Sequence, residues 1–152
     1  MTDASPNSAD DAPRLRVEIP VAWGEMDSLG HVNNTIYLRW FESARIAYFE
    51  EVGVLDRFKT EEIGPILARA TIDFRKPVAH PDTVTVSARV VRTGNSSFVM
   101  AYTATSAAQG GALVAEGEGV IVMVHYPSGK SVALGALTEA MEAFEGRPLG
   151  AS

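Results

Sequence analysis

Hydrophobic and polar residues alternate along most of the chain, which is the pattern of strands with one buried face. In the first stretch, every second residue from Leu15 to Trp23 is apolar, and the residues that alternate with them include Arg14, Arg16 and Glu18. Because proline cannot donate a hydrogen bond, Pro20 places this strand at a sheet edge or bulges it near its end. The same alternation predicts further strands over Leu67–Lys76, Thr83–Arg92, Ser97–Thr105 and Leu113–His125.

Between residues 35 and 52 apolar residues recur at every fourth position instead, which predicts the one long helix of the chain. Asn33 or Asn34 can cap the start of this helix, and Gly53 suits the position after its end. A short helix over residues 138–145 is expected to begin with Thr138 as its N-cap. The apolar residues that repeat along the long helix are Ile36, Trp40, Ala44 and Tyr48.

The order of these elements favours an α+β fold, with the long helix packed on one face of a curved antiparallel sheet of about five strands. Short connections between the last four strands predict an antiparallel meander. Gly117 and Gly119 share one face of the longest strand and would weaken it unless another group packs close to the backbone there. Residues 1–13 and 146–152 are expected to be a disordered and a flexible tail around a domain over residues 14–145.

The composition of the chain excludes several classes of functional site and partner. The 152 residues include no cysteine, which excludes disulfides, thiolate nucleophiles, zinc fingers and iron–sulfur clusters. The three histidines match no metal-binding spacing, so neither a metal nor another cofactor is expected. Thirteen basic against nineteen acidic residues give a net charge of −6, which disfavours nucleic acid and anionic membranes as partners. No apolar run approaches the ~18 residues of a membrane span, and the acidic start is no secretory signal, so a cytoplasmic protein is expected.

The loop before the long helix concentrates the candidate catalytic residues. Its residues Asp27, Gly30, His31, Asn33 and Asn34 lie at the N-terminus of that helix, where free backbone N–H groups favour negative charge. An aspartate there can act as a base or nucleophile, and the N–H groups can hold an oxyanion. The alternative is purely structural, because Asp-x-x-Gly is also typical of a type I turn and the asparagines can simply cap the helix.

The stretch GEMDSLGHVNNTIY, residues 24–37, resembles the signature of the 4-hydroxybenzoyl-CoA thioesterase family. Residues 74–98, FRKPVAHPDTVTVSARVVRTGNSSF, resemble the following strands of that family, and the similarity covers residues 14–126. The resemblance implies a hotdog fold, in which a curved sheet wraps a long helix. It also implies that two chains pair, commonly through sheet edges, with each site between them, so a homodimer or homotetramer is expected.

In that family, the position of Asp27 holds the catalytic carboxylate, which attacks the thioester carbonyl or draws a proton from water. The position of Asn34 offers its backbone N–H to the thioester oxygen, and Gly30 allows a tight approach of the loop to the substrate. His31 also resembles a histidine in the proposed catalytic set of plant acyl carrier protein thioesterases. The alternative for His31 is a loop histidine tied to a neighbouring carboxylate or carbonyl.

Further residues are candidates for substrate binding. Tyr37 can line an acyl pocket, although core packing is the usual role of an aromatic at helical spacing. Cations at strand ends can hold the phosphates of coenzyme A, and polar residues in a turn match a family region that lines the pantetheine or nucleotide. Ordinary surface chemistry is the alternative for each of them. The polar candidates are Asn33, Arg75, Lys76, Arg92, Asn95, Ser96 and Ser97.

The function implied is hydrolysis of an acyl-CoA thioester to a carboxylic acid and free CoA. Two alternatives stay open, namely hydrolysis of acyl groups on an acyl carrier protein and a non-catalytic module that binds acyl-CoA. A hydratase is disfavoured, because the Asp27 to His31 spacing does not match the usual pair of such enzymes. The sequence leaves the acyl group undefined.

Overall fold

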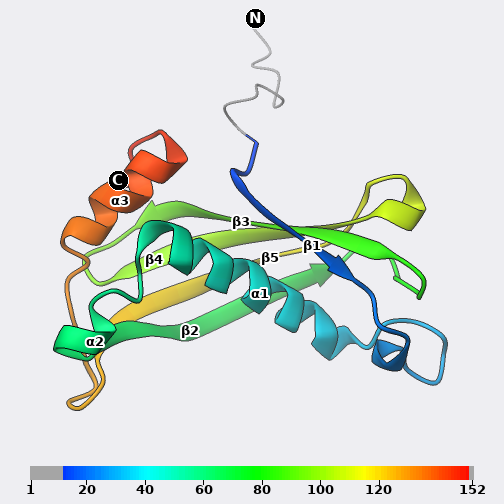
Figure 1. Cartoon of the computed structure of the whole chain (residues 1–152), viewed down its shortest axis with the longest axis horizontal. Helices are drawn as coiled ribbons and strands as arrows, with labels where there is room; N and C mark the ends of the chain where they lie inside the picture. Colours follow the sequence, from blue (N-terminus) through cyan, green and yellow to red (C-terminus); the bar gives the residue numbers. More distant parts are fainter. Residues whose placement is uncertain (1–11, 151–152) are drawn as a thin grey trace, which may run out of the picture.

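One antiparallel sheet with a long helix against it accounts for most of the computed structural model, which describes residues 12–150 (Figure 1). The strands lie in the order β1-β3-β4-β5-β2, and a short strand β6 (Lys130–Ser131) pairs with β5. The fold is therefore the expected α+β arrangement. The bounds of the long strands are Leu15–Pro20 for β1, Ile63–Phe74 for β2, Thr83–Thr93 for β3, Ser97–Ser106 for β4 and Ala112–His125 for β5.

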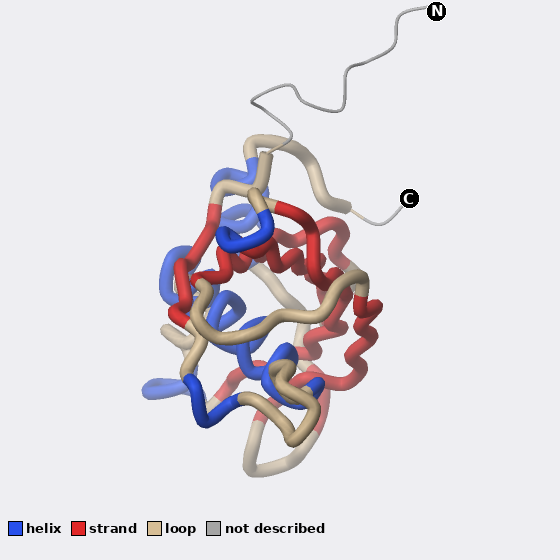
Figure 2. Tube along the Cα trace, turned by 90° about the vertical axis from the view of Figure 1, so that its right-hand side faces the viewer, coloured by secondary structure: helices blue, strands red, loops and turns tan. Residues whose placement is uncertain are grey.

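Helix α1 (Asn34–Val52) is the long helix that the sequence predicts. Asn33 caps it by accepting the backbone N–H of Thr35, and Gly53 ends it with a φ of 79° in the left-handed region. The strands curve around α1, as the view from the right-hand side of Figure 1 shows (Figure 2). The residues of α1 that the sheet buries are Tyr37, Trp40, Phe41, Ala44, Tyr48 and Phe49.

Strand β2 does not form a hairpin with β3, so the expected four-strand meander is wrong at this point. It pairs with β5 along its whole length and begins at Ile63, four residues before the predicted start. The segment 75–82 crosses instead from edge strand β2 to β3, which lies second from the opposite edge, and its prolines at 77 and 81 make a tight hairpin turn unfavourable. Strand β2 is therefore an edge strand, and most of its side chains are exposed.

Two predicted boundaries also differ from the structure. Strand β1 ends at Pro20, and Trp23 lies 74 % exposed in the short turn η1 (Trp23–Glu25) rather than on a buried strand face. Helix α3 (Ala136–Glu145) starts after Gly135, so Thr138 is not its N-cap. The earlier start follows from the buried Leu137, which anchors the first turn.

The remaining short elements are α2 (Phe58–Glu61) and η2 (Ala107–Gln109). After α3 the chain continues along β3, where the buried Leu149 accepts the backbone N–H of Thr93 through its carbonyl. Leu149 and Gly150 of the expected tail therefore join β3 at Thr93, whereas residues 1–11 and 151–152 lie outside the described part. None of the helices within residues 12–150 is long and apolar enough to cross a membrane.

The two glycines of β5 occupy sites where a side chain does not fit, as the sequence predicts. A Cβ on Gly117 would lie 2.2 Å from the carbonyl oxygen of Thr71 and 3.1 Å from the ring of Phe41. A Cβ on Gly119 would lie 2.8 Å from the hydroxyl oxygen of Tyr102. These glycines therefore let β2 and the side chains under α1 approach the backbone of β5.

A buried carboxylate joins three elements at the other end of α1. One oxygen of Glu145 on α3 accepts the Tyr48 hydroxyl at 2.6 Å and the backbone N–H of Val90 at 3.0 Å. The pairing of β3 with β4 shifts between Val90 and Arg92, so this N–H lies at a bulge. Glu145 thus supplies a partner to a buried backbone donor at the bulge.

Candidate functional site

The loop between η1 and α1 is fixed in place by backbone hydrogen bonds at several points. The Val32 N–H donates to the carbonyl of Val78 at 2.8 Å, which ties the loop to the segment after β2. The Asn33 N–H donates to the carbonyl of Glu25 at 2.9 Å. The Glu25 carboxylate accepts the N–H of Ala22 and is therefore committed to η1 rather than to Asp27. The loop consequently presents Asp27 from a backbone held on both sides.

Asp27 forms the turn that the structural alternative predicts. Its carbonyl accepts the N–H of Gly30 at 3.1 Å, and Gly30 has a φ of +81°, which glycine adopts without strain. Its Oδ1 accepts the N–H groups of Leu29 at 2.9 Å and His31 at 3.3 Å. Within residues 12–150 no donor reaches Oδ2, and the side chain is exposed. The turn therefore orients the carboxylate and leaves one oxygen open.

Asn33 leaves one N–H of the helix terminus open. Its side-chain oxygen accepts the backbone N–H of Thr35 at 3.0 Å and the Thr35 hydroxyl at 2.9 Å, while its carbonyl accepts the N–H of Ile36. The N–H of Asn34 has no acceptor among the described residues. Asn33 therefore acts as the helix cap. The first backbone donor of α1 remains available for an acceptor from outside the chain.

His31 and Tyr37 take different positions around this loop. The imidazole of His31 is exposed and forms no hydrogen bond or ion pair with any described residue. Tyr37 is buried, with its ring centroid 4.6 Å from that of Trp40 and 5.0 Å from that of Phe74. Burial raises the pKa of the Tyr37 hydroxyl, and a hydrogen bond from the backbone of Val78 partly opposes this. Tyr37 thus packs in the core directly beneath the loop.

Arg75 and Lys76 lie at the same end of the molecule as Asp27. Both follow β2 immediately, and their backbone N–H groups donate to the carbonyl of Val114. The Arg75 guanidinium hydrogen-bonds Glu116 at 3.4 Å and lies 3.8 Å from Asp73, whereas Lys76 forms no ion pair within residues 12–150. These two residues are two or three positions before Val78, which bonds the site loop.

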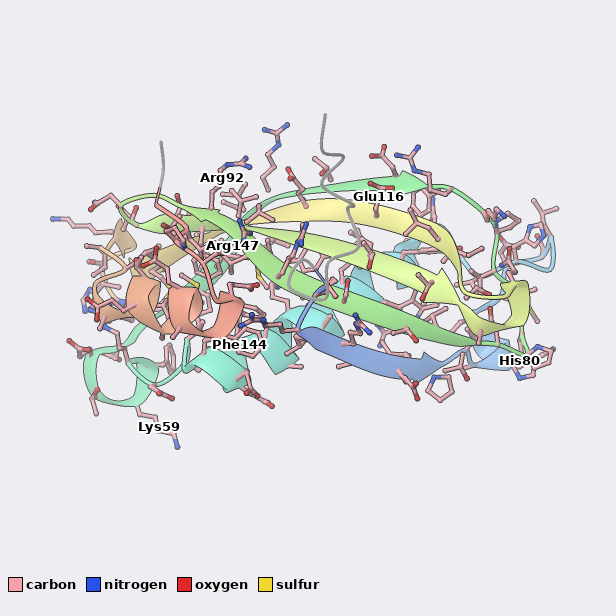
Figure 3. All side chains as sticks on the ribbon, turned by 90° about the horizontal axis from the view of Figure 1, so that it is seen from above. Lys59, His80, Arg92, Glu116, Phe144 and Arg147 are labelled. Atoms are coloured by element: carbon pink, nitrogen blue, oxygen red, sulfur yellow. The ribbon has the colours of Figure 1, made fainter. Side chains whose placement is uncertain are left out.

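Arg92 and residues 95–97 lie at the opposite end. Thr83 at the start of β3 pairs with Pro20 beside the site loop, and nine further residues at ~3.3 Å each place Arg92 about 30 Å away. His80, whose backbone N–H contacts Met26 in the loop, lies at one end of the molecule, and Arg92 lies near α3 (Figure 3). One chain therefore does not bring all the predicted binding residues together.

A groove that the sequence pattern does not predict lies between α1 and β2. It holds two cavities of about 160 Å³ and 170 Å³, and both are lined by Glu42, Arg45 and Leu67. The sequence suggests only a surface pair between Glu42 and Arg45, which lie 3.8 Å apart, but the side chain of Arg45 is just 11 % exposed. The missed signal is that Arg45 lies four positions from both Phe41 and Phe49 on the buried stripe of the helix.

Two further features lie outside the loop. A cavity of about 560 Å³ lies on the sheet and is lined by Ser87, Arg89, Thr103 and Glu116, but by no residue of the loop. Among residues 12–150, no cluster of three or more histidine or acidic side chains has the arrangement of a metal site. The loop with its aspartate and open N–H is therefore the candidate reaction site.

Known proteins resemble this chain over most of its length. A family model described as the thioesterase-like superfamily matches residues 21–142. A thioesterase from Thermus thermophilus, crystallised with coenzyme A and Zn, shares 34% identity, covers 90% of this chain and 98% of its own, and has a TM-score of 0.78. The protein PA2801 from Pseudomonas aeruginosa also shares 34% identity, with a TM-score of 0.72 over 80% of this chain and 92% of its own. The long-chain acyl-CoA thioesterase FadM of Escherichia coli is 25% identical over 129 residues, which are 84% of this chain and 97% of FadM.

Proposed function

The chain belongs to the thioesterase-like superfamily, and we propose that it hydrolyses an acyl-CoA thioester to a carboxylic acid and free CoA. The observation that carries this proposal is the pairing, in one loop, of an oriented aspartate with an open N–H at the start of α1. The crystallisation of the Thermus thermophilus thioesterase with coenzyme A supports CoA as the carrier. The name of FadM supports an acyl-CoA substrate in the same way.

In this proposal Asp27 supplies the open Oδ2 to the reaction. It either attacks the thioester carbonyl, giving an anhydride that water then hydrolyses, or takes a proton from a water that attacks the carbonyl. In both routes the thiolate of CoA leaves and is protonated. The N–H donors of Leu29 and His31 on Oδ1 hold the carboxylate in one orientation, so that less ordering is needed in the transition state.

The N–H of Asn34 would stabilise the oxyanion that forms on the thioester oxygen. It is the first donor of a helix of 19 residues, where the helix dipole adds a partial positive charge. A backbone donor fixed in advance is worth most in a site from which water is excluded. Gly30 allows the turn that brings the aspartate before this helix.

The coenzyme A would lie with its phosphates near Arg75 and Lys76, at the loop end of β2. Arg92, Asn95, Ser96 and Ser97 lie at the opposite end of the same chain, so they would not hold phosphates placed near its Arg75 and Lys76. They would join that phosphate site as residues of a second chain. The proposal therefore includes a homodimer, or a homotetramer built from it, with each site between two chains.

The free edge of β2 is the surface we assign to this pairing. Within residues 12–150 strand β2 pairs with no strand other than β5, so its other edge offers backbone groups to a further strand. Its side chains Ile66, Leu67 and Phe74 are between 41 % and 49 % exposed, which is unusual for residues of this size. Pairing with the same strand of a second copy would satisfy this edge and cover these side chains.

The test is a panel of purified acyl-CoAs of different chain length and aromaticity, with release of free thiol as the signal. We expect release from at least one member with the wild-type protein and none above background with Asp27→Asn. Binding of acyl-CoAs without turnover of any would contradict the proposed hydrolysis and would favour the non-catalytic module.

A further inference from the structure

The groove between α1 and β2 contains a cation that is almost completely buried. The guanidinium of Arg45 donates to the Tyr102 hydroxyl at 3.3 Å and lies 3.8 Å from the exposed Glu42 carboxylate. A guanidinium carries five N–H donors, and these two long contacts use only part of them. A buried charge is costly unless its donors find partners, so the groove is built to accept a further hydrogen-bond acceptor.

Tyr102 adds a second donor to the same wall. Its ring stacks on Phe41 at 5.0 Å with 13° between the planes, and the residue is 2 % exposed. Its oxygen accepts from Arg45, so the hydroxyl proton remains to be donated, and the described residues offer it no acceptor. Burial raises the pKa of Tyr102, which keeps this proton on the oxygen at neutral pH. The absence of a side chain at Gly119 makes the space that the hydroxyl occupies.

Apolar side chains line the rest of the groove, together with charged side chains whose sum is positive. Leu38, Phe41 and Leu67 line it together with Arg39, Glu42 and Arg45. Glu118 also borders the cavity, but side chains alternate along β5 and those of positions 117 and 119 face α1. The Glu118 side chain therefore points to the other face of the sheet. Two arginines against one glutamate remain, and they favour an electron-rich occupant.

The groove begins one helical turn from the proposed reaction site. Leu38 at its near end is one helical turn after Asn34, whose N–H would face the thioester. Arg45 is eleven residues after Asn34, or about 16 Å along the helix axis, and helical side chains lean back toward the N-terminus. An extended acyl chain of about ten carbons is ~11 Å long, because each C–C bond advances it by somewhat more than 1 Å. The Arg45 side chain, which leans back toward Asn34, would supply the rest of the distance.

We infer that the groove between α1 and β2 binds the acyl group of the substrate, and that Arg45 and Tyr102 select acyl chains carrying an oxygen acceptor, a hydroxyl or a carboxylate, at their far end. This inference rests on the proposed function and names its substrate class. The apolar lining would hold the methylene groups, while the two donors would replace the water that the distal oxygen loses. A plain alkyl chain would leave the donors without that partner.

The experiment compares decanoyl-CoA with ω-hydroxydecanoyl-CoA and decanedioyl-CoA, which differ only at the far end of the chain. We expect kcat/KM of the wild type to be about tenfold or more higher for one or both oxygenated chains, and the better of the two identifies the oxygen that the site takes. Tyr102→Phe keeps the ring stack and should reduce the preference to below about threefold. Arg45→Met should abolish it, while the matched control Arg57→Gln, on α2's N-terminal side, should leave it unchanged.

Several outcomes separate this inference from the proposed function. Equal hydrolysis of all three substrates by the wild type overturns the inference and leaves the thioesterase proposal intact. Absence of any hydrolysis overturns the proposed function. Calorimetric binding of the three substrates to Asp27→Asn then tests whether the groove selects a distal oxygen. Tighter binding of the oxygenated chains supports this selection, and equal binding overturns it. If Arg45→Met and Tyr102→Phe fold normally, keep the wild-type preference and weaken the dimer instead, a second chain occupies the groove and the inference is wrong.

Discussion

The carboxylate of Asp27 accepts the backbone N–H of Leu29 at 2.9 Å, within a turn that ends at Gly30. An Asx contact of this kind is an ordinary structural device. Here it also fixes the direction of an exposed carboxylate that keeps its second oxygen open. The structural and catalytic interpretations of the motif therefore describe the same geometry, and only the chemistry of the side chain separates them.

Replacing Asp27 by asparagine distinguishes the structural from the catalytic interpretation of the motif. The amide can still accept the N–H groups of Leu29 and His31, so the melting temperature should stay close to that of the wild type. Because an amide is a poor nucleophile and a negligible base, kcat/KM should fall by ~10²–10⁴-fold or more. Thiol release under identical conditions checks this, with Asp56→Asn as a control for loss of a surface charge. An Asp27→Asn protein that retains most of its turnover would falsify the catalytic assignment.

Neutralising Lys76 should raise KM more than it lowers kcat. A contact to a remote phosphate is the same in the ground state and the transition state, so its loss weakens binding of both. The effect should shrink for a truncated thioester that lacks the nucleotide. Lys59→Gln on α2 serves as the matched control, since its side chain projects away from the body of the molecule (Figure 3). Equal penalties on the full and truncated substrates would exclude a phosphate contact for Lys76.

A charge placed on the free edge of β2 should separate the chains. Ile66 is 41 % exposed, pairs with Val122 on β5 and borders the second cavity of the groove. Ile66→Lys should give a monomer in light scattering, and activity should be lost because each site lacks its second chain. Leu113→Lys, on β5 and 37 % exposed, should remain assembled and active. An active Ile66→Lys monomer contradicts a site shared between chains.

The fold should lose stability in alkaline solution. Burial raises the pKa of Tyr37, Tyr48 and Tyr102, and the Glu145 carboxylate raises that of Tyr48 further. In the unfolded chain these hydroxyls ionise near pH 10, whereas the folded chain keeps them protonated. The stabilisation is thus fully present below about pH 10 and is lost as the pH rises above it, by up to ~1.4 kcal/mol per pH unit for each tyrosine.

Urea unfolding between pH 8 and 11 measures this loss. Tyr48→Phe should fall less steeply with pH because one raised pKa is absent. At neutral pH the same variant should be less stable by about 1–3 kcal/mol, since the buried Glu145 carboxylate loses a donor. An identical alkaline slope in the wild type and Tyr48→Phe would show that Tyr48 does not contribute.

Much of the fold follows from local sequence patterns. The cap at Asn33, the end of α1 at Gly53 and the close packing at Gly117 are all confirmed, because each depends on a few neighbouring residues or on one face of a strand. The partner of β2 could not be predicted in this way. Strand pairing is non-local, and the alternation over residues 67–76 is the same whether the strand pairs with β3 or β5.

In the candidate site too, local features follow from the sequence and non-local ones do not. Asp27 in the loop and Asn34 at the start of α1 are only seven positions apart, so their nearness in sequence is read directly from the motif, while their catalytic roles stay predictions. The distance of Arg92 from that loop depends on the direction of β3 in the sheet, which the alternation does not give. Arg45 was missed because an i, i+3 pair with Glu42 accounts for it on a helix surface, and its burial depends on the neighbouring β2.

The bulge at Val90 has a consequence for the order in which the chain can fold during synthesis. Its buried N–H is satisfied by Glu145, which leaves the ribosome some 55 residues later. Until α3 emerges, a nascent chain that has already paired β3 with β4 carries an open backbone donor in its interior and lacks the last contact of Tyr48. We therefore expect native packing at this end to be completed only once Glu145 has emerged, so that chains truncated before Glu145 remain protease-sensitive.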